Sequence, residues 1–147
     1  MAKRRRTNAV MTPEFTGRCA SGVCDPVRTQ GLKAPAAKGT HDLVVLDGPG
    51  LFVAAAVSKQ GGANDLTFVI LDIDGRNVTN LSFAAANNQG LTQHNPYGLV
   101  LLHSPVIKTM TIGFPTPLVF KRSLRLSVKV NESNVVQIVA NVIRGSA

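Results

Sequence analysis

The closest pair of acidic side chains that could do chemistry is Asp72 and Asp74, two residues apart in LDIDGRNVT. Their spacing matches the start of a calcium-binding loop. Such a loop needs a third Asp or Asn and then a Gly, and here Arg76 and Asn77 occupy those positions. Asp74-Gly75 favours a two-residue β-hairpin, because a type I′ turn needs a positive φ at both central positions. We predict a hairpin here and no metal site.

The cysteines are the second candidate pair. Cys19 and Cys24 are the only two in the chain, and four residues separate them. Two thiols cannot complete a tetrahedral zinc site, and His41, His94 and His103 are scattered along the sequence. The pair either closes a short disulfide loop or stays reduced as two small side chains. We favour the reduced pair.

Catalytic motifs are missing from the rest of the sequence. It has no nucleophile elbow, no glycine-rich phosphate loop and no cluster of His, Asp and Glu. We therefore expect a protein that is not an enzyme and needs no cofactor.

Positive charge is concentrated at the start of the chain. The formal net charge is +8, and residues 1–40 hold eight Lys or Arg against Glu14 and Asp25. Residues 41–147 hold eight Lys or Arg against six acids. No apolar run follows the basic start as a secretory signal requires, and no run is long enough to cross a membrane. We expect a soluble, unexported protein without a membrane partner.

The character of the sequence changes near residue 41. Residues 1–40 contain scattered Pro and Gly and no sustained periodicity, which predicts an extended basic arm. From Leu43 onward, short β-branched runs alternate with turn residues, which predicts a folded domain over residues 41–147. The runs, expected to be strands, are residues 43–47, 51–58, 66–73, 77–83, 98–103, 106–114, 118–130 and 135–143.

The run LVFKRSLRLSVKV, residues 118–130, has the clearest pattern. Apolar side chains occupy every second position from Leu118 to Val130, and Arg122 is the one interruption. A period of two over 13 residues excludes a helix and predicts a single half-buried strand with a basic outer face.

Eight such strands without a helical pattern predict an all-β sandwich, most simply a Greek-key jelly roll. The long polar loop AAANNQGLTQHNPYG, residues 84–98, is either a contact site or a passive surface loop. Its candidate contact residues are Asn87, Asn88, Gln93, His94 and Tyr97.

Residues 48–143 resemble small β-sandwich proteins encoded among the structural genes of tailed bacteriophages. The matching positions are Gly50, Leu71, Ile73, Asp74, Gly75, Leu118, Phe120, Ser123, Leu124, Leu126 and Val128. The resemblance implies a virion component, such as a head decoration (cement) protein, a head fibre or a minor tail protein, and it implies no catalytic residues. The basic arm is not part of that pattern.

Two functions are open for the arm. It could neutralise packaged nucleic acid, as in a coat protein whose arm contacts the genome. Its apolar residues favour docking on protein, so we expect a decoration protein that binds the major capsid protein or other virion proteins. We further expect a homo-oligomer, with a trimer favoured, that is made in the host cytoplasm and sits on the capsid surface. The arm residues expected to bind are Lys3, Arg4, Arg5, Arg6, Val10, Met11, Phe15 and Arg18.

Overall fold

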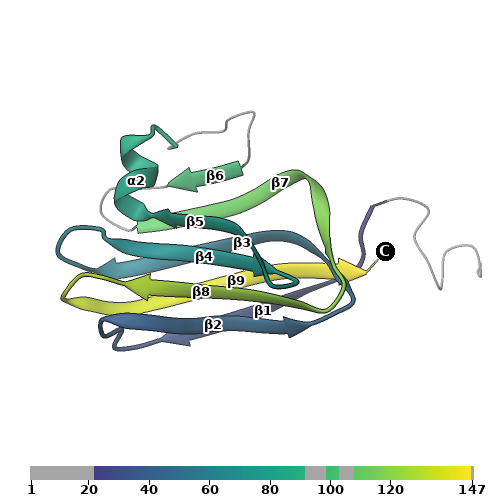
Figure 1. Cartoon of the computed structure of the whole chain (residues 1–147), viewed down its shortest axis with the longest axis horizontal. Helices are drawn as coiled ribbons and strands as arrows, with labels where there is room; N and C mark the ends of the chain where they lie inside the picture. Colours follow the sequence, from purple (N-terminus) through teal and green to yellow (C-terminus); the bar gives the residue numbers. More distant parts are fainter. Residues whose placement is uncertain (1–21, 92–98, 103–107, 147) are drawn as a thin grey trace, which may run out of the picture.

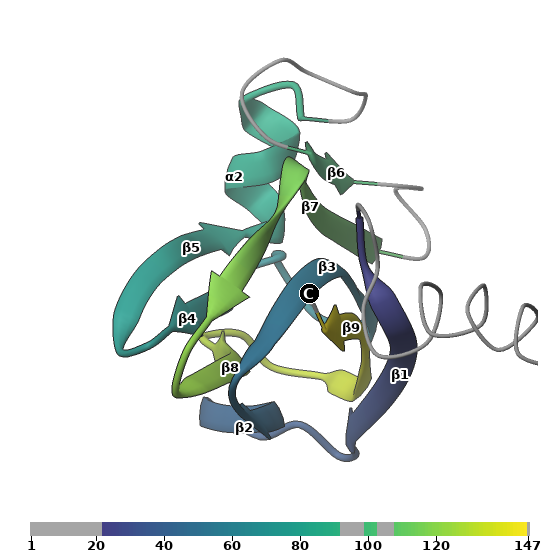
Figure 2. The same cartoon turned by 90° about the vertical axis from the view of Figure 1, so that its right-hand side faces the viewer.

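The computed structural model describes residues 22–91, 99–102 and 108–146, which form two antiparallel sheets packed face to face (Figure 1 and Figure 2). One sheet has the strand order β1-β9-β3-β7-β6 and the other β2-β8-β4-β5. This architecture confirms the predicted all-β sandwich. The strands are β1 (Cys24–Lys33), β2 (Gly39–Asp47), β3 (Gly50–Gly61), β4 (Thr67–Ile73), β5 (Arg76–Ser82), β6 (Leu99–Leu102), β7 (Lys108–Phe120), β8 (Ser123–Val130) and β9 (Val135–Ser146).

The order of strand pairing is that of a jelly roll. With β6 set aside, the first strand pairs with the last, the second with the next to last, and so on inward: β1–β9, β2–β8, β3–β7 and β4–β5. The chain is thus one long antiparallel ribbon rolled into two sheets. The apex of the ribbon is the Asp74-Gly75 turn, where φ is 53° and 79°. These positive values agree with the predicted type I′ hairpin.

The core lies between the sheets and follows the period of two in the sequence. Alternate residues of the central strands point inward, and their side chains are fully buried. Fully burying one such side chain contributes about 1.5–3 kcal/mol. The largest buried apolar side chains are Phe52, Leu71, Phe83, Met110, Ile112, Phe120, Leu124, Leu126 and Ile138.

The sandwich begins earlier in the chain than the predicted boundary at residue 41. Strand β1 pairs with β9 from Cys24 to Lys33, and Ala36 is buried in the core just after it. The predicted arm therefore differs from the structure over residues 24–40, and residues 1–21 lie outside the described part. β1 escapes the sequence pattern because it is an edge strand with Pro26 and Gly31, and most of its side chains are exposed.

The single strand predicted over residues 118–130 is two strands in different sheets. β7 ends at Phe120, Lys121 and Arg122 form the connection, and β8 begins at Ser123. A two-residue connection preserves the alternation, so Phe120 and Leu124 both point into the core from opposite sheets. Arg122, the interruption in the apolar pattern, marks the turn.

The segment predicted as a loop over residues 84–98 begins with a short helix, α2 (Phe83–Asn88). The Ser82 hydroxyl accepts a hydrogen bond of 3.0 Å from the Ala85 amide and caps the helix. Phe83 and Ala86 are buried, so α2 packs onto the core beside β4 and β5. The run of three alanines after a capping serine is the helical signal that period-two reasoning missed.

A buried ion pair closes the end of the sandwich opposite the hairpin tip. Lys59 at the end of β3 is 1% exposed, and Glu132 in the β8–β9 connection is 3% exposed. The Lys59 Nζ donates to Glu132 Oε2 at 3.0 Å and to Asp65 Oδ1 at 2.7 Å. It also lies 5.4 Å from the centre of the Phe83 ring. One cation thus joins the β3–β4 and β8–β9 connections.

The Glu132 carboxylate has a partner at each oxygen. Oε2 also accepts from the Thr67 hydroxyl, and Oε1 accepts from the backbone amides of Asn64 and Asp65 at 3.2 and 3.0 Å. Burial alone would raise the pKa of Glu132. The hydrogen bonds from Thr67, Lys59 and Asn64, together with the charge of Lys59, outweigh burial and hold the pKa below its ordinary value.

Glu132→Gln should destabilise the fold by about 3 kcal/mol, because it leaves a buried ammonium with a weaker partner. Denaturant unfolding measures this loss. Adding Lys59→Met to Glu132→Gln should recover part of it, since the buried charge is then gone. The exposed Asp42→Asn is the control and should change stability by less than about 0.5 kcal/mol. A Glu132→Gln effect no larger than that of the control would contradict the assignment.

Truncation tests where the sandwich begins. Removing residues 1–21, with Cys24→Ser because Cys19 is lost, should leave a cooperative thermal transition. Removing residues 1–33 deletes β1 and should lower the Tm by more than about 10 °C, because several kcal/mol of pairing with β9 is lost. If the two truncations melt alike, a boundary near residue 41 is correct after all.

Candidate functional site

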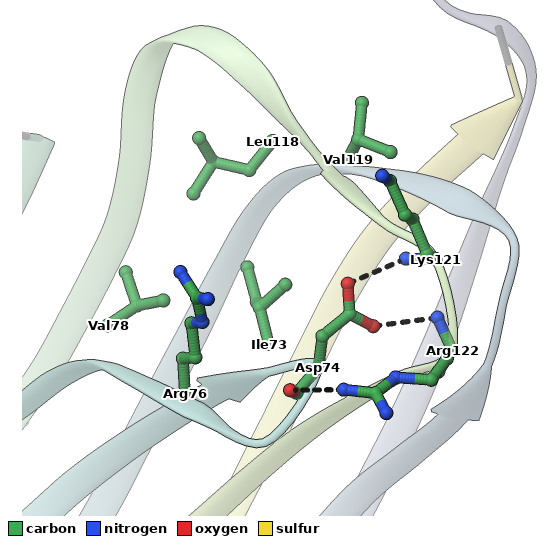
Figure 3. A pocket seen from close by; sticks show the side chains of 8 residues that line it. All are labelled: Ile73, Asp74, Arg76, Val78, Leu118, Val119, Lys121 and Arg122. Atoms are coloured by element: carbon green, nitrogen blue, oxygen red, sulfur yellow. Dashed lines mark hydrogen bonds between the residues drawn. The ribbon is translucent and has the colours of Figure 1, made fainter.

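A cleft in the described part of the chain lies at the apex of the ribbon, between the β4–β5 hairpin and the end of β7 (Figure 3). Its volume is about 600 Å³. We call it the tip cleft. Its lining residues are Ile73, Asp74, Arg76, Val78, Leu118, Val119, Lys121 and Arg122.

The Asp74 side chain holds the two walls of the tip cleft together. Its carboxylate accepts hydrogen bonds from the backbone amides of Lys121 and Arg122 at 2.9 and 2.6 Å (Figure 3), and from the backbone amide of Ser123 at 3.0 Å. The Arg122 guanidinium donates back to the Asp74 carbonyl at 3.0 Å, and the Asp74 amide donates to the Ser123 carbonyl at 2.9 Å. The hairpin tip is therefore fixed to the β7–β8 connection by five hydrogen bonds.

These contacts lower the pKa of Asp74 from 3.8 to about 2, chiefly through the amides of Lys121, Arg122 and Ser123. A lowered folded-state pKa means that the unfolded chain binds the proton more tightly. The stabilisation from Asp74 is therefore complete above pH 3.8 and is lost as the pH falls toward about 2. At neutral pH this carboxylate is ionised and accepts from three backbone amides.

Two cations of the tip cleft form no ion pair among the described residues. Within the part of the chain that the structure describes, no carboxylate forms an ion pair with the side chain of Arg76 or Lys121. Figure 3 draws these side chains from different walls, with Ile73 between them. Val119 and Val78 add exposed apolar surface, at 56% and 39% exposure. The tip cleft thus combines free positive charge with an apolar lining.

The outer face of the five-stranded sheet is a second surface of unusual composition. Cross-strand pairing places Ile143 and Ala54 in one row, and Ser58 and Thr109 in another. These rows face outward, because the residues that adjoin them along the strands and point into the core are Val142, Ala55, Val57 and Met110. We call this surface the small-residue face. Its members on β1, β9, β3 and β7 are Arg28, Gln30, Leu32, Val139, Asn141, Ile143, Ala54, Ala56, Ser58, Thr109 and Thr111.

The two outer faces differ in charge. Arg28, on the edge strand β1, is the one ionisable member of the small-residue face, and it donates to the Asn141 side chain at 2.7 Å. The outer rows of the four-stranded sheet carry Asp42, Arg125, Asp72 and Lys129. A solvated sheet face is expected to be polar and charged, as the second one is. The near absence of charged side chains from the small-residue face therefore needs an explanation.

Most residues predicted to bind a partner fall outside the described residues. These are Lys3, Arg4, Arg5, Arg6, Val10, Met11, Phe15 and Arg18 of the arm, Cys19, and Gln93, His94 and Tyr97. Asn87 and Asn88 lie in α2 rather than in a loop. Cys24 begins β1 and is disulfide-bonded, in contrast to the reduced pair that we favoured. The other cysteine of the chain is Cys19.

The sequence did not predict that the residues of the tip cleft lie together. Asp74 was read as a turn residue, and Arg122 as an interruption in a strand. The sequence did contain a signal. Arg122 interrupts an apolar alternation and so marks a turn, and the backbone amides of a turn need hydrogen-bond acceptors such as Asp74. Nothing in the linear sequence brings that turn to Asp74, 47 to 49 residues earlier.

The described residues offer neither a metal site nor a membrane-spanning helix. Among them, no group of three or more His, Cys, Asp and Glu side chains could hold a metal ion. None of their helices is long and apolar enough to span a membrane.

Asp74→Asn should lower the Tm at neutral pH and flatten the loss of stability in acid. The amide replaces an ionised acceptor, so its bonds to the three backbone N–H groups are weaker. Thermal unfolding at a series of pH values measures both effects, as the difference between wild-type and variant curves. Asp47→Asn removes an equal charge from exposed β2 and should leave the acid dependence unchanged. Equal curves for the two variants would contradict the role given to Asp74.

No protein-family model matches the chain, and no curated protein is similar to it in sequence. Among solved structures, the crystal structure of FLHE is similar with a TM-score of 0.42 and 11% identity, covering 86% of this chain and 100% of that chain. Dimeric latent PorU from Porphyromonas gingivalis is similar with a TM-score of 0.39 and 16% identity. The match covers 89% of this chain but 14% of PorU. At such TM-scores neither structure bears on the function of this chain.

Proposed function

We propose that this chain is a structural protein of a virus particle, a decoration protein that binds the capsid lattice and stabilises it. Jelly rolls of eight strands are a common architecture of virion proteins, although lectins and cupins use them too. The strand motifs that resemble phage structural proteins supply the reason to prefer the virion. The protein would be made in the host cytoplasm and sit on the outside of the capsid.

The small-residue face is the observation that carries this proposal. Protein interfaces are depleted of charged side chains at their centre, and this face has none away from its edge. The middle strand of this face, β3, carries Ala54, Ala56 and Ser58, whose short side chains let another protein surface approach closely. A surface of this kind suits a protein that works by binding proteins.

We assign a second copy of this chain to the small-residue face. Each copy carries a formal net charge of +8, most of it in residues 1–40, so two copies repel where their basic regions approach each other. An uncharged face is where they can meet without placing like charges opposite each other. The result is a closed oligomer, consistent with the symmetry of most soluble assemblies.

The positively charged regions of the protein would bind the capsid lattice. Residues 3–6 are four consecutive basic residues, and the tip cleft adds Arg76 and Lys121. Both would bind acidic patches on the major capsid protein. Each copy then bridges neighbouring capsid subunits and raises the free energy needed to separate them. This division assigns self-association to the neutral face and lattice binding to the cations.

Ala56→Arg should break self-association, because it places a charge at the centre of the small-residue face. We expect wild-type protein to be oligomeric at about tens of micromolar and the variant to be monomeric, by light scattering. Asn80→Arg adds the same charge to the outer face of the other sheet and should remain oligomeric. A monomeric wild-type protein, or loss of the oligomer in both variants, would exclude this face as the interface.

The virion assignment is tested on virus particles purified from the source culture by density gradient. Mass spectrometry should find the chain in the fractions that hold intact capsids, in a fixed ratio to the major capsid protein. Particles stripped of genome should retain it, because the proposed contacts are with protein. A chain found only in the soluble fraction while particles assemble would overturn the proposal, and loss together with the genome would favour a genome-binding coat protein.

A further inference from the structure

We propose that the tip cleft is a docking site for an extended acidic segment of a partner protein. In this arrangement Arg76 and Lys121 bind carboxylates of the segment, and an apolar side chain between those carboxylates packs on Val78 and Val119. The inference rests on the proposed function only in naming the partner as a virion protein, because the chemistry of the site is independent of it.

The charge of the cleft selects an anionic occupant. Three of its lining side chains are cationic, and Arg122 is engaged by the Asp74 carbonyl. Arg76 and Lys121 keep all of their side-chain donors available within the described residues. The one carboxylate in the lining, Asp74, accepts from three backbone amides and points its oxygens at the β7–β8 connection (Figure 3). Three cations face this one acid in the lining, so an incoming carboxylate finds a net positive charge and the free donors of Arg76 and Lys121.

The apolar lining selects a protein segment over a nucleic acid. Phosphate binding needs cations and amides, and base binding adds aromatic side chains for stacking. The cleft has no aromatic side chain in its lining, and its remaining members are aliphatic. Val119 and Val78 are well exposed, so an apolar side chain of a partner would remove aliphatic surface from water. A segment that alternates acidic and apolar residues matches both features.

The site is preformed, and it adjoins an open sheet edge. The bonds of Asp74 fix the distance between the hairpin and β7, so little ordering is needed when a partner binds. β5, which carries Arg76 and Val78, is the last strand of its sheet, and no described strand pairs with its outer edge. An extended segment could therefore lie along β5 and bond to its backbone while its side chains enter the cleft.

The probe for the test is a fluorescein-labelled synthetic peptide in which Asp and Glu alternate with Val and Leu, carried in a Gly-Ser sequence. Fluorescence anisotropy with the full-length protein measures its affinity. Arg76→Gln with Lys121→Gln should weaken binding by about tenfold or more, because hydrogen bonds to charged groups are lost. The matched control, Lys33→Gln with Lys129→Gln, removes two exposed cations away from the cleft and should bind like wild type. Val119→Thr should also weaken binding, because it keeps the shape but adds a hydroxyl.

Two further probes decide the class of partner. A peptide with Asn and Gln in place of Asp and Glu should not bind, and a single-stranded oligonucleotide should bind wild type and the cleft variant equally. Equal peptide affinities for the cleft variant and its control would overturn the inference. An oligonucleotide that depends on Arg76 and Lys121 more than the peptide does would replace the protein segment with a nucleic acid.

Binding to purified particles separates this inference from the virion proposal. If the cleft variant joins particles as wild type does, the docking site is wrong and the decoration role stands. If wild type binds the peptide through the cleft but joins no particle, the docking site stands and the decoration role is wrong.

Discussion

The fold depends on a carboxylate bound by three backbone amides. A ribbon rolled into a jelly roll has a free apex, and here that apex is the Asp74-Gly75 turn. Asp74 accepts from the amides of Lys121, Arg122 and Ser123, which lie where the chain passes from one sheet to the other. Arg122 also accepts from the Gly48 amide through its carbonyl at 2.8 Å, so the β2–β3 connection joins the same cluster. Three turns that are distant in sequence are thus held at one end of the sandwich, and the tip cleft lies between the β4–β5 hairpin and the end of β7.

The opposite end is held by a different device, the buried Lys59–Glu132 pair. Such pairs contribute little net stability, because desolvation of two charges cancels much of their attraction. Either group alone in an apolar interior is costly, so the two must be buried together. Gly62 contributes to this fit, because a Cβ at that position would overlap the Glu132 carboxylate. Polar contacts therefore fix how the turns meet at both ends, while the apolar middle supplies the free energy of folding.

Features that follow from local sequence patterns were predicted, and features that depend on how distant segments pack together were missed. Period-two runs and Asp74-Gly75 located the strands and the apex, and the jelly roll followed from them. β1 was missed because an edge strand buries few side chains, and Pro26 and Gly31 resemble a linker. The turn at Lys121 was missed because a two-residue connection keeps the inward alternation in phase across two sheets. The tip cleft could not be predicted at all, because its walls are β5 and β7, which meet only when the ribbon rolls up.

The jelly-roll topology also places the neutral and the positively charged side chains on different surfaces, which matters for assembly. It places neutral side chains over β9 and β3, in the middle of one outer face, and gathers Arg76, Lys121 and Arg122 at the end of the sandwich. Charge acts over roughly 8 Å at physiological salt, whereas apolar contact requires full approach. An acidic surface would therefore attract the tip cleft before any contact forms, and the neutral face would bind only a surface that fits it closely. A protein built this way can meet its own copies and an acidic lattice through separate surfaces, so that neither contact competes with the other.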